Sequence, residues 1–243
     1  MLLHELDLDA YTQMLLTFKR SGYQAVKFQD IDETDLDNKV VYRHDVDVTV
    51  EGAVALARVE RQCDVVSTYY FLLTSPLYNM LSREISDQIH IINDLGHDVA
   101  LHFNPHYYGL GALQYIKSEL GILGKFYPFA NLEWISFHRP GAYAGQLGQI
   151  QLPDGVHHTY EPLFFETLGY FSDSRGAWSH GHPTESEDFR ANKGMQVLTH
   201  PIWWYQDGGT AGETLEHEAD RRREELLIQI RAEVFPKTNP EFF

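Results

Sequence analysis

The chain has 243 residues, 43% of them hydrophobic, so it is long enough to bury a substantial core. Its 19 Lys and Arg against 35 Asp and Glu give a formal charge of −16, which repels phosphate backbones and anionic membranes and argues against nucleic-acid binding. The single cysteine, Cys63, excludes an intramolecular disulfide framework and is compatible with a reducing compartment.

The N-terminal segment predicts an amphipathic helix that ends near Gly22, with Asp9 as its expected N-cap. Four apolar residues follow that cap at helical spacing: Tyr11, Met14, Leu15 and Phe18. The segment lacks the basic start and continuous apolar core of a signal peptide. No apolar run approaches the roughly 20 residues of a membrane span. We therefore expect a cytoplasmic protein without a membrane span.

Six β-rich runs then alternate with helical patterns, which is typical of βα units and a mostly parallel sheet. The expected strands are residues 39–45, 64–73, 97–103, 132–138, 169–174 and 195–200. The expected helices are residues 52–62, 79–95, 110–126, 160–168 and 213–234. Long loops are expected at residues 141–158 and 180–193. Because no repeat or Gly/Ser/Pro-rich linker divides the chain, we expect one α/β domain over residues 1–243.

Polar residues gather at the predicted carboxyl ends of these strands, where parallel α/β barrels place their sites. They are Asp45, Asp47, His102, His106, Arg139, Asp173 and His200. Residues i and i+2 of a strand share a face, so Asp45 and Asp47 in the stretch RHDVD bring like charges together. This pair predicts a positive group nearby.

The HxxxH formed by His102 and His106 suggests that this group is a metal ion. Pro105 argues against a regular helix between the two histidines, so they are expected to span a strand end and the following turn. Two imidazoles and one carboxylate form a common divalent metal set with positions left open, and a bound cation would let both aspartates stay ionised. Since the chain has 13 His, HxxxH alone is weak. The same ligand set also describes a non-haem Fe(II) oxygenase, although the βα pattern favours hydrolysis.

Five segments occur in the order of the five motifs of the polysaccharide deacetylase family of carbohydrate esterases, over about residues 40–201. They read RHDVD, GHDVALHFNPH, SFHRPG, DSRGAW (173–178) and VLTHP. The sequence resembles a divergent member, because the first motif is HDVD rather than two contiguous aspartates. The resemblance implies a distorted (β/α)7 barrel with a divalent metal, usually zinc, that hydrolyses N-acetyl or O-acetyl groups of sugars.

The resemblance also implies a role for each matching residue. Asp47, His102 and His106 match the metal ligands, Asp45 the catalytic base, Arg139 the arginine that supports the base, His200 the general acid and Asp173 the carboxylate that tunes it. A backbone N–H near residues 141–143 would complete an oxyanion hole. The third motif departs from the family pattern, since Arg139 is followed directly by Pro140 and the nearest tyrosine is Tyr143.

Aromatic residues near the motifs are candidates for stacking on sugar rings, namely Tyr107, Tyr143 and Trp203. Purely structural roles remain open for four of the candidate site residues: Asp45 as a loop cap, Asp47 as a turn residue, Arg139 in a structural salt bridge, and Asp173 in an ordinary turn. Five other histidines receive no role, namely His44, His97, His138, His157 and His180.

The expected function is metal-dependent removal of an acetyl or similar acyl group from an amino sugar or glycan precursor. The alternative is a catalytically weak member of the same fold that binds carbohydrate or a partner protein. A homo-oligomer is possible.

Overall fold

The computed structural model describes residues 6–143, 150–206 and 209–235, with only the backbone at 142 and 143. Its sheet follows the order β6-β5-β4-β3-β2-β8-β7, and β1 pairs with β2 beside this path. All of these pairings are parallel. The strands are β1 (Gln24–Ala25), β2 (Lys39–Val46), β3 (Thr68–Phe71), β4 (Asp98–Phe103), β5 (Asn131–Phe137), β6 (His157–His158), β7 (Gly169–Ser172) and β8 (Met195–Thr199). The seven parallel strands of the main path confirm the expected distorted (β/α)7 barrel, and β1 is an eighth strand beside it.

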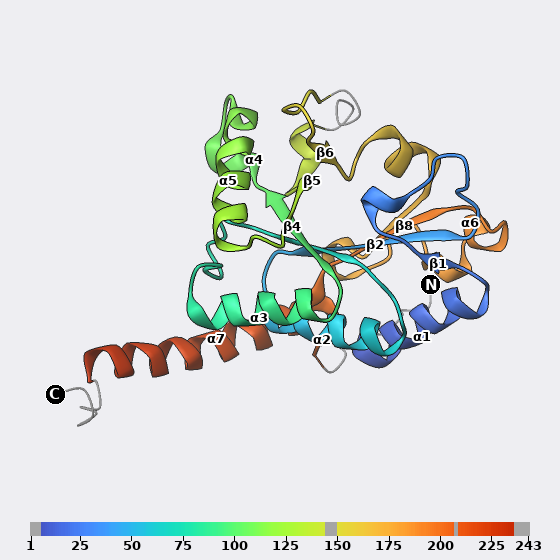
Figure 1. The fold of residues 1–243 in the computed structure, drawn as a ribbon. Coiled ribbons are helices and arrows are strands. Elements are labelled where there is room, and N and C mark those ends of the chain that lie inside the picture. Colours follow the sequence, from blue (N-terminus) through green and yellow to red (C-terminus); the bar gives the residue numbers. More distant parts are fainter. Residues whose placement is uncertain (1–5, 144–149, 207–208, 236–243) are drawn as a thin grey trace.

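Helices α1, α2 and α3 lie together along one side of the sheet, while α7 runs past them and away from the body (Figure 1). The α-helices are α1 (Leu8–Arg20), α2 (Val50–Gln62), α3 (Arg83–Asp94), α4 (Pro105–Tyr108), α5 (Ile116–Phe126), α6 (Glu187–Arg190) and α7 (Ala211–Val234). In these ranges no helix has both the length and the apolar character that a membrane span requires.

Helix α1 confirms the predicted apolar stripe but corrects its cap. The N-cap is Asp7, whose Oδ1 accepts a hydrogen bond from Ala10 N at 2.7 Å, and Asp9 lies inside the first turn. All four apolar residues predicted for the stripe are buried. Asp9 has the right residue type for a cap, but the helix begins at Leu8 because Asp7 accepts from the free amide of Ala10, the third helical residue.

Some element boundaries also differ from expectation. Strand β3 is shorter than the apolar run 64–73, and β1 and β6 are too short to leave a periodic signal. The helix expected at 160–168 is one π-helical turn, Leu163–Thr167. The loop expected at 180–193 includes α6 and the short 3₁₀ turn Pro183–Glu185.

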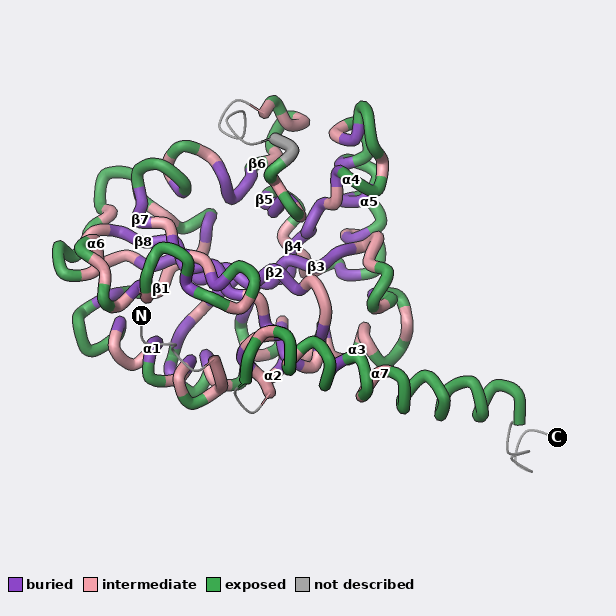
Figure 2. Tube along the Cα trace, turned by 180° about the vertical axis from the view of Figure 1, so that it is seen from behind, coloured by how far each residue is buried: buried purple, intermediate pink, exposed green. Residues whose placement is uncertain are grey.

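The two faces of the curled sheet carry different side chains. Val40, Tyr42 and Val46 of β2 pack in a large core with the helices, whereas Val41 belongs to a smaller cluster with residues of β3, β4 and β5. The smaller cluster contains Phe28, Tyr70, Ala100, Trp134, Phe164 and Leu168. Figure 2 shows the strands as the buried centre of the molecule. Apolar residues therefore fill the inner face toward the amino ends, and the residues that follow them on that face are polar.

Candidate active site

Strand alternation places the candidate site on the inner face. Val41 in β2 is followed there by Arg43 and Asp45, and Trp134 in β5 is followed by Ser136 and His138. A pocket of about 940 Å³ lies at this end of the sheet, a size that suits a small ligand. Its lining includes seven residues predicted from the sequence: Asp45, Asp47, His102, His106, Arg139, His200 and Trp203.

Asp45 is held by Arg43 from the same strand. Arg43 is fully buried and donates two hydrogen bonds to the carboxylate, from Nε to Oδ1 at 2.9 Å and from Nη2 to Oδ2 at 2.7 Å. Ser136 Oγ donates a third, at 3.0 Å. The guanidinium also lies 4.5 Å from the Tyr160 ring centroid, a cation–π distance. Two parallel N–H donors hold a carboxylate more rigidly than a single donor could.

The positive group beside Asp45 is thus part of the chain. Burial opposes ionisation of Asp45, but Arg43, with support from His102, keeps its pKa below the usual value. The prediction gave the supporting role to Arg139, yet the guanidinium bonded to Asp45 is that of Arg43. The signal was available in the sequence, because Arg43 lies two residues before Asp45 and therefore on the same strand face.

Three ligand atoms converge beside this pair: Asp47 Oδ1, His102 Nε2 and His138 Nδ1. The carboxylate oxygen lies 3.1 Å from each nitrogen, and the nitrogens are 3.2 Å apart. Asp47 follows β2 directly, His102 lies in β4, and His138 follows β5. No role is predicted for His138 from the sequence. However, the alternation of Trp134 and Ser136 along β5 places His138 on the same face of the sheet.

The geometry of this trio fits a divalent metal. Tetrahedral zinc with ligands at about 2.0–2.1 Å separates neighbouring ligand atoms by about 3.3 Å, close to the three distances seen here. Asp47 Oδ1 is buried and accepts no hydrogen bond of acceptable geometry from the described residues, despite its two close nitrogens. His102 Nδ1 lies 3.3 Å from Ser136 O, so an N–H there would leave the Nε2 lone pair facing Asp47.

His106 lies outside this trio. It is exposed on the one-turn helix α4, which Pro105 begins, so the HxxxH spans a strand and a helical turn. Its Nε2 is 3.1 Å from the Arg139 carbonyl oxygen. Arg139 itself has φ +49, a left-handed backbone that costs a non-glycine residue energy and that recurs at functional sites.

His200 and Asp173 form a tight pair on the other side of Asp47. His200 Nδ1 lies 2.6 Å from Asp173 Oδ1, and His200 Nε2 lies 4.0 Å from Asp47 Oδ2. Asp173 is fully buried and also accepts the Trp204 Nε1–H at 2.6 Å. Burial alone would lower the pKa of His200, but Asp173, helped by Asp47 and Asp45, raises it to about 9. A protonated imidazole therefore faces the pocket at neutral pH.

The three aromatic residues predicted to contact a sugar lie in different places relative to the pocket. Trp203 lines the pocket and lies over Gly176, where an added Cβ would be 3.4 Å from Trp203 Cδ2. The adjacent Trp204 is buried instead. Tyr107 is 65% exposed on α4 and does not line the pocket. The side chain of Tyr143 lies outside the described residues, although its backbone ends the 3₁₀ turn Pro140–Tyr143.

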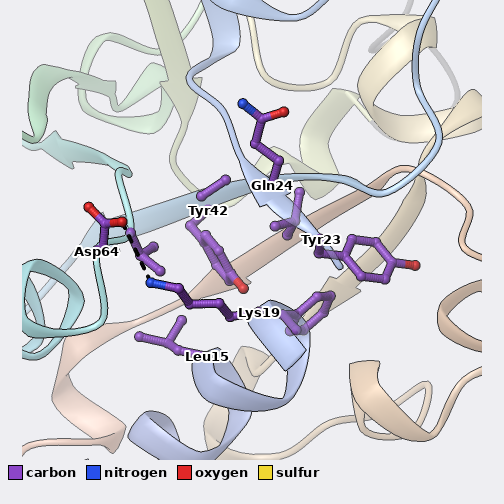
Figure 3. A pocket seen from close by; sticks show the side chains of 10 residues that line it. Leu15, Lys19, Tyr23, Gln24, Tyr42 and Asp64 are labelled. Carbon is purple, nitrogen blue, oxygen red and sulfur yellow. Dashed lines mark ion pairs between the residues drawn. The ribbon is translucent and has the colours of Figure 1, made fainter. Parts of the chain in front are cut away.

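A second pocket, of about 320 Å³, lies between α1 and the amino-terminal half of β2. Figure 3 shows Lys19 reaching toward Asp64, with a 3.5 Å ion pair. Lys19 Nζ also donates to Cys63 O at 3.0 Å. None of the predicted site residues lines this pocket.

No protein-family model matches the chain, and no curated protein matches it in sequence. Among solved structures it is similar to the chitin deacetylase from the fungal pathogen Colletotrichum lindemuthianum, with a TM-score of 0.42, 15% identity, and coverage of 75% of this chain and 81% of that one. It is also similar to a family 4 carbohydrate esterase from Bacillus anthracis, with a TM-score of 0.42, 13% identity, and coverage of 88% of this chain and 86% of that one.

Proposed function

We propose that the chain is a metal-dependent hydrolase that removes an acetyl or similar acyl group from an amino sugar or glycan precursor. The observation that carries this proposal is the convergence of Asp47, His102 and His138 between two preset groups, the carboxylate of Asp45 and the imidazole of His200. The five ordered sequence motifs support the same reaction class. In this proposal His138, rather than His106, is the third ligand.

A divalent metal held by these three residues would polarise the acyl carbonyl and lower the pKa of a water molecule. The residues of the chain supply the proton transfers. Asp45, ionised and fixed by Arg43, takes the proton of the attacking water. His200, charged through Asp173, donates a proton to the leaving amine or alcohol. Base and acid each lie beside a proposed ligand: Asp45 Oδ2 is 3.7 Å from His102 Nε2, and His200 Nε2 is 4.0 Å from Asp47 Oδ2.

Two histidines and one carboxylate also suit a non-haem Fe(II) oxygenase. The fixed base and the charged general acid favour hydrolysis, because an oxygenase needs neither of them. Oxygen consumption with an oxo-acid cosubstrate would reverse this preference, whereas sugar binding without turnover would favour a binding protein of the same fold.

The deciding measurement is metal content by elemental analysis after zinc loading and dialysis. We expect about one equivalent in the wild type, its loss in His102→Ala and His138→Ala, and its retention in the matched variant His106→Ala. Retention in His138→Ala with loss in His106→Ala would contradict the proposed ligand set. A wild type that binds no metal would contradict the mechanism itself. Acetate release from a panel of acetylated mono- and oligosaccharides then tests the reaction.

A further inference from the structure

The second half of α7 extends away from the body, although Glu225, Leu226 and Gln229 border a pocket that residues 76–85 also line. The first half is anchored, because Glu218 is buried and accepts from Tyr205 OH at 2.6 Å, and Arg222 Nη2 donates to Val48 O at 2.5 Å. After Arg222, every residue from 223 to 235 is exposed. Figures 1 and 2, from opposite sides, both show this half extending away from the body.

This free half carries an apolar stripe. Six large apolar residues of this half are exposed, and four of them, Leu226, Leu227, Ile230 and Val234, lie within an arc of about 100° on the helix. Arg223 falls within the same arc, and Ile228 and Phe235 lie outside it. The exposed fractions of the four apolar residues in the arc are 55%, 44%, 49% and 61%. A helix of about 13 residues is marginal in water on its own, and such a stripe normally packs against another surface.

The charges beside the stripe identify a matching surface. Glu224 and Arg231 are seven residues apart and so lie on the same flank, while Arg222 and Glu233 lie on the other. Turning a second copy of the helix antiparallel about the midpoint between Leu227 and Ile228 sets Glu224 opposite Arg231, and by two-fold symmetry this pair occurs twice. Arg222 takes no part in the pairing, because it already donates to Glu218, Leu77 O and Val48 O. Glu224, Arg231 and Glu233 form no ion pair among the described residues.

We propose that the exposed half of α7 is a dimerisation surface whose partner is a second copy of this chain, in an antiparallel helix pair with this register. The reciprocal charges favour a second copy over an unrelated partner, because Glu and Arg complement one another about a single point of this sequence. The stripe supplies the association energy, and the flanking charges fix direction and register. The proposal does not depend on the reaction proposed above.

The test is sedimentation velocity over a range of micromolar concentrations, with charge-reversed variants of the full chain. Glu224→Arg and Arg231→Glu each place two like-charge pairs in the dimer, so each is expected to raise the dimer Kd at least about tenfold. The double variant, Glu224→Arg with Arg231→Glu, restores both opposite-charge pairs and is expected to recover affinity to within about threefold. Glu33→Arg, at an exposed position away from α7, is the matched control and should not change Kd.

Glu and Arg are both good helix formers, so far-UV circular dichroism should stay constant across the set. Leu227→Ser, which removes one member of the stripe, should also weaken the dimer. A wild type that remains monomeric at the highest concentration overturns the proposal. The proposal is also overturned if the single charge reversals leave the dimer Kd unchanged, or if the double variant does not recover the wild-type affinity.

Discussion

The positive group predicted beside Asp45 and Asp47 includes Arg43, which lies in the same strand as Asp45. A guanidinium that is fully buried would be costly if left unpaired, and its two bonds to Asp45 provide the compensation. Arg43 neutralises Asp45, so the cation expected to let both aspartates stay ionised would act mainly beside Asp47, whose Oδ1 lies 3.1 Å from His102 Nε2 and from His138 Nδ1.

Asp173 gives a testable pH dependence at the residue scale. Because its carboxylate raises the pKa of His200 to about 9, we expect Asp173→Asn to lower that pKa, leave His200 neutral at pH 8 and reduce kcat there by about 10²-fold. The alkaline limb of the kcat profile should move to lower pH. Trp204→Phe removes the indole N–H that donates to Asp173 but keeps the charge, and should leave the limb in place. An unmoved limb in Asp173→Asn would show that His200 is not the general acid.

At the scale of elements, strand length decided which strands could be predicted from the sequence. The runs that became β2, β4, β5, β7 and β8 were predicted within a few residues, because alternation and apolar content persist over most of each strand. The two-residue strands β1 and β6 carry no such pattern. The HxxxH drew attention to His106, whereas extending the β5 alternation by one residue would have indicated His138. Both histidines line the pocket, and which of them comes within ligand distance of Asp47 depends on the path of the chain after Phe103 and after Phe137, which local sequence does not determine.

The contact between α4 and α5 contains a carboxyl group with a second pH dependence. Glu119 on α5 is 1% exposed, and burial raises its pKa to about 7 although it accepts a bond from Tyr108 OH at 2.7 Å. Its other oxygen has no hydrogen-bond partner among the described atoms. The folded state therefore holds a proton that the unfolded chain releases near pH 4.5. The free energy of unfolding should therefore fall as the pH rises from about 4.5 to about 7, by about 1.4 kcal/mol per pH unit at most.

Glu119→Gln should remove this dependence, since the amide stays neutral and can still accept from Tyr108. We expect a higher Tm than wild type at pH 8 and little difference at pH 5, measured by thermal unfolding. Glu133→Gln, an exposed carboxyl on β5, is the control and should track the wild type at both pH values. Equal Tm shifts at pH 5 and pH 8 would contradict the assignment.

For the whole molecule, Glu60 on α2 joins the helix layer to the outer face of the sheet. Its carboxylate is fully buried and lies within 2.6–2.7 Å of four groups from four other segments. They are Tyr11 OH of α1, His44 Nε2 of β2, Ser67 Oγ before β3 and Tyr69 OH of β3. Burial would raise the pKa of Glu60, but His44 and the other donors lower it to about 2. One charge thus ties several elements together directly behind the site.

Glu60→Gln should destabilise the fold by on the order of 3 kcal/mol at pH 7, because an amide nitrogen cannot accept from the hydroxyls that face it. The sign of the pH dependence follows from the lowered pKa. Wild-type stability should be complete above about pH 4.5 and decline toward pH 2, and this acid slope should flatten in the variant. Urea unfolding at pH 7 and pH 3 measures both effects. A variant that loses stability equally at both pH values would show that packing, not charge, is what Glu60 supplies.

The two rows of side chains on β2 limit how this strand can change. Arg43 and Asp45 face the pocket, while His44 between them faces Glu60 on the helix side. Because the side chains of a strand alternate, deleting one residue before position 43 would exchange the rows, sending His44 inward and both charges into the helix layer. A one-residue change in the length of β2 would therefore abolish the candidate site and the buried network together. We expect natural and laboratory variants to alter this strand by substitution and not by inserting or deleting a single residue.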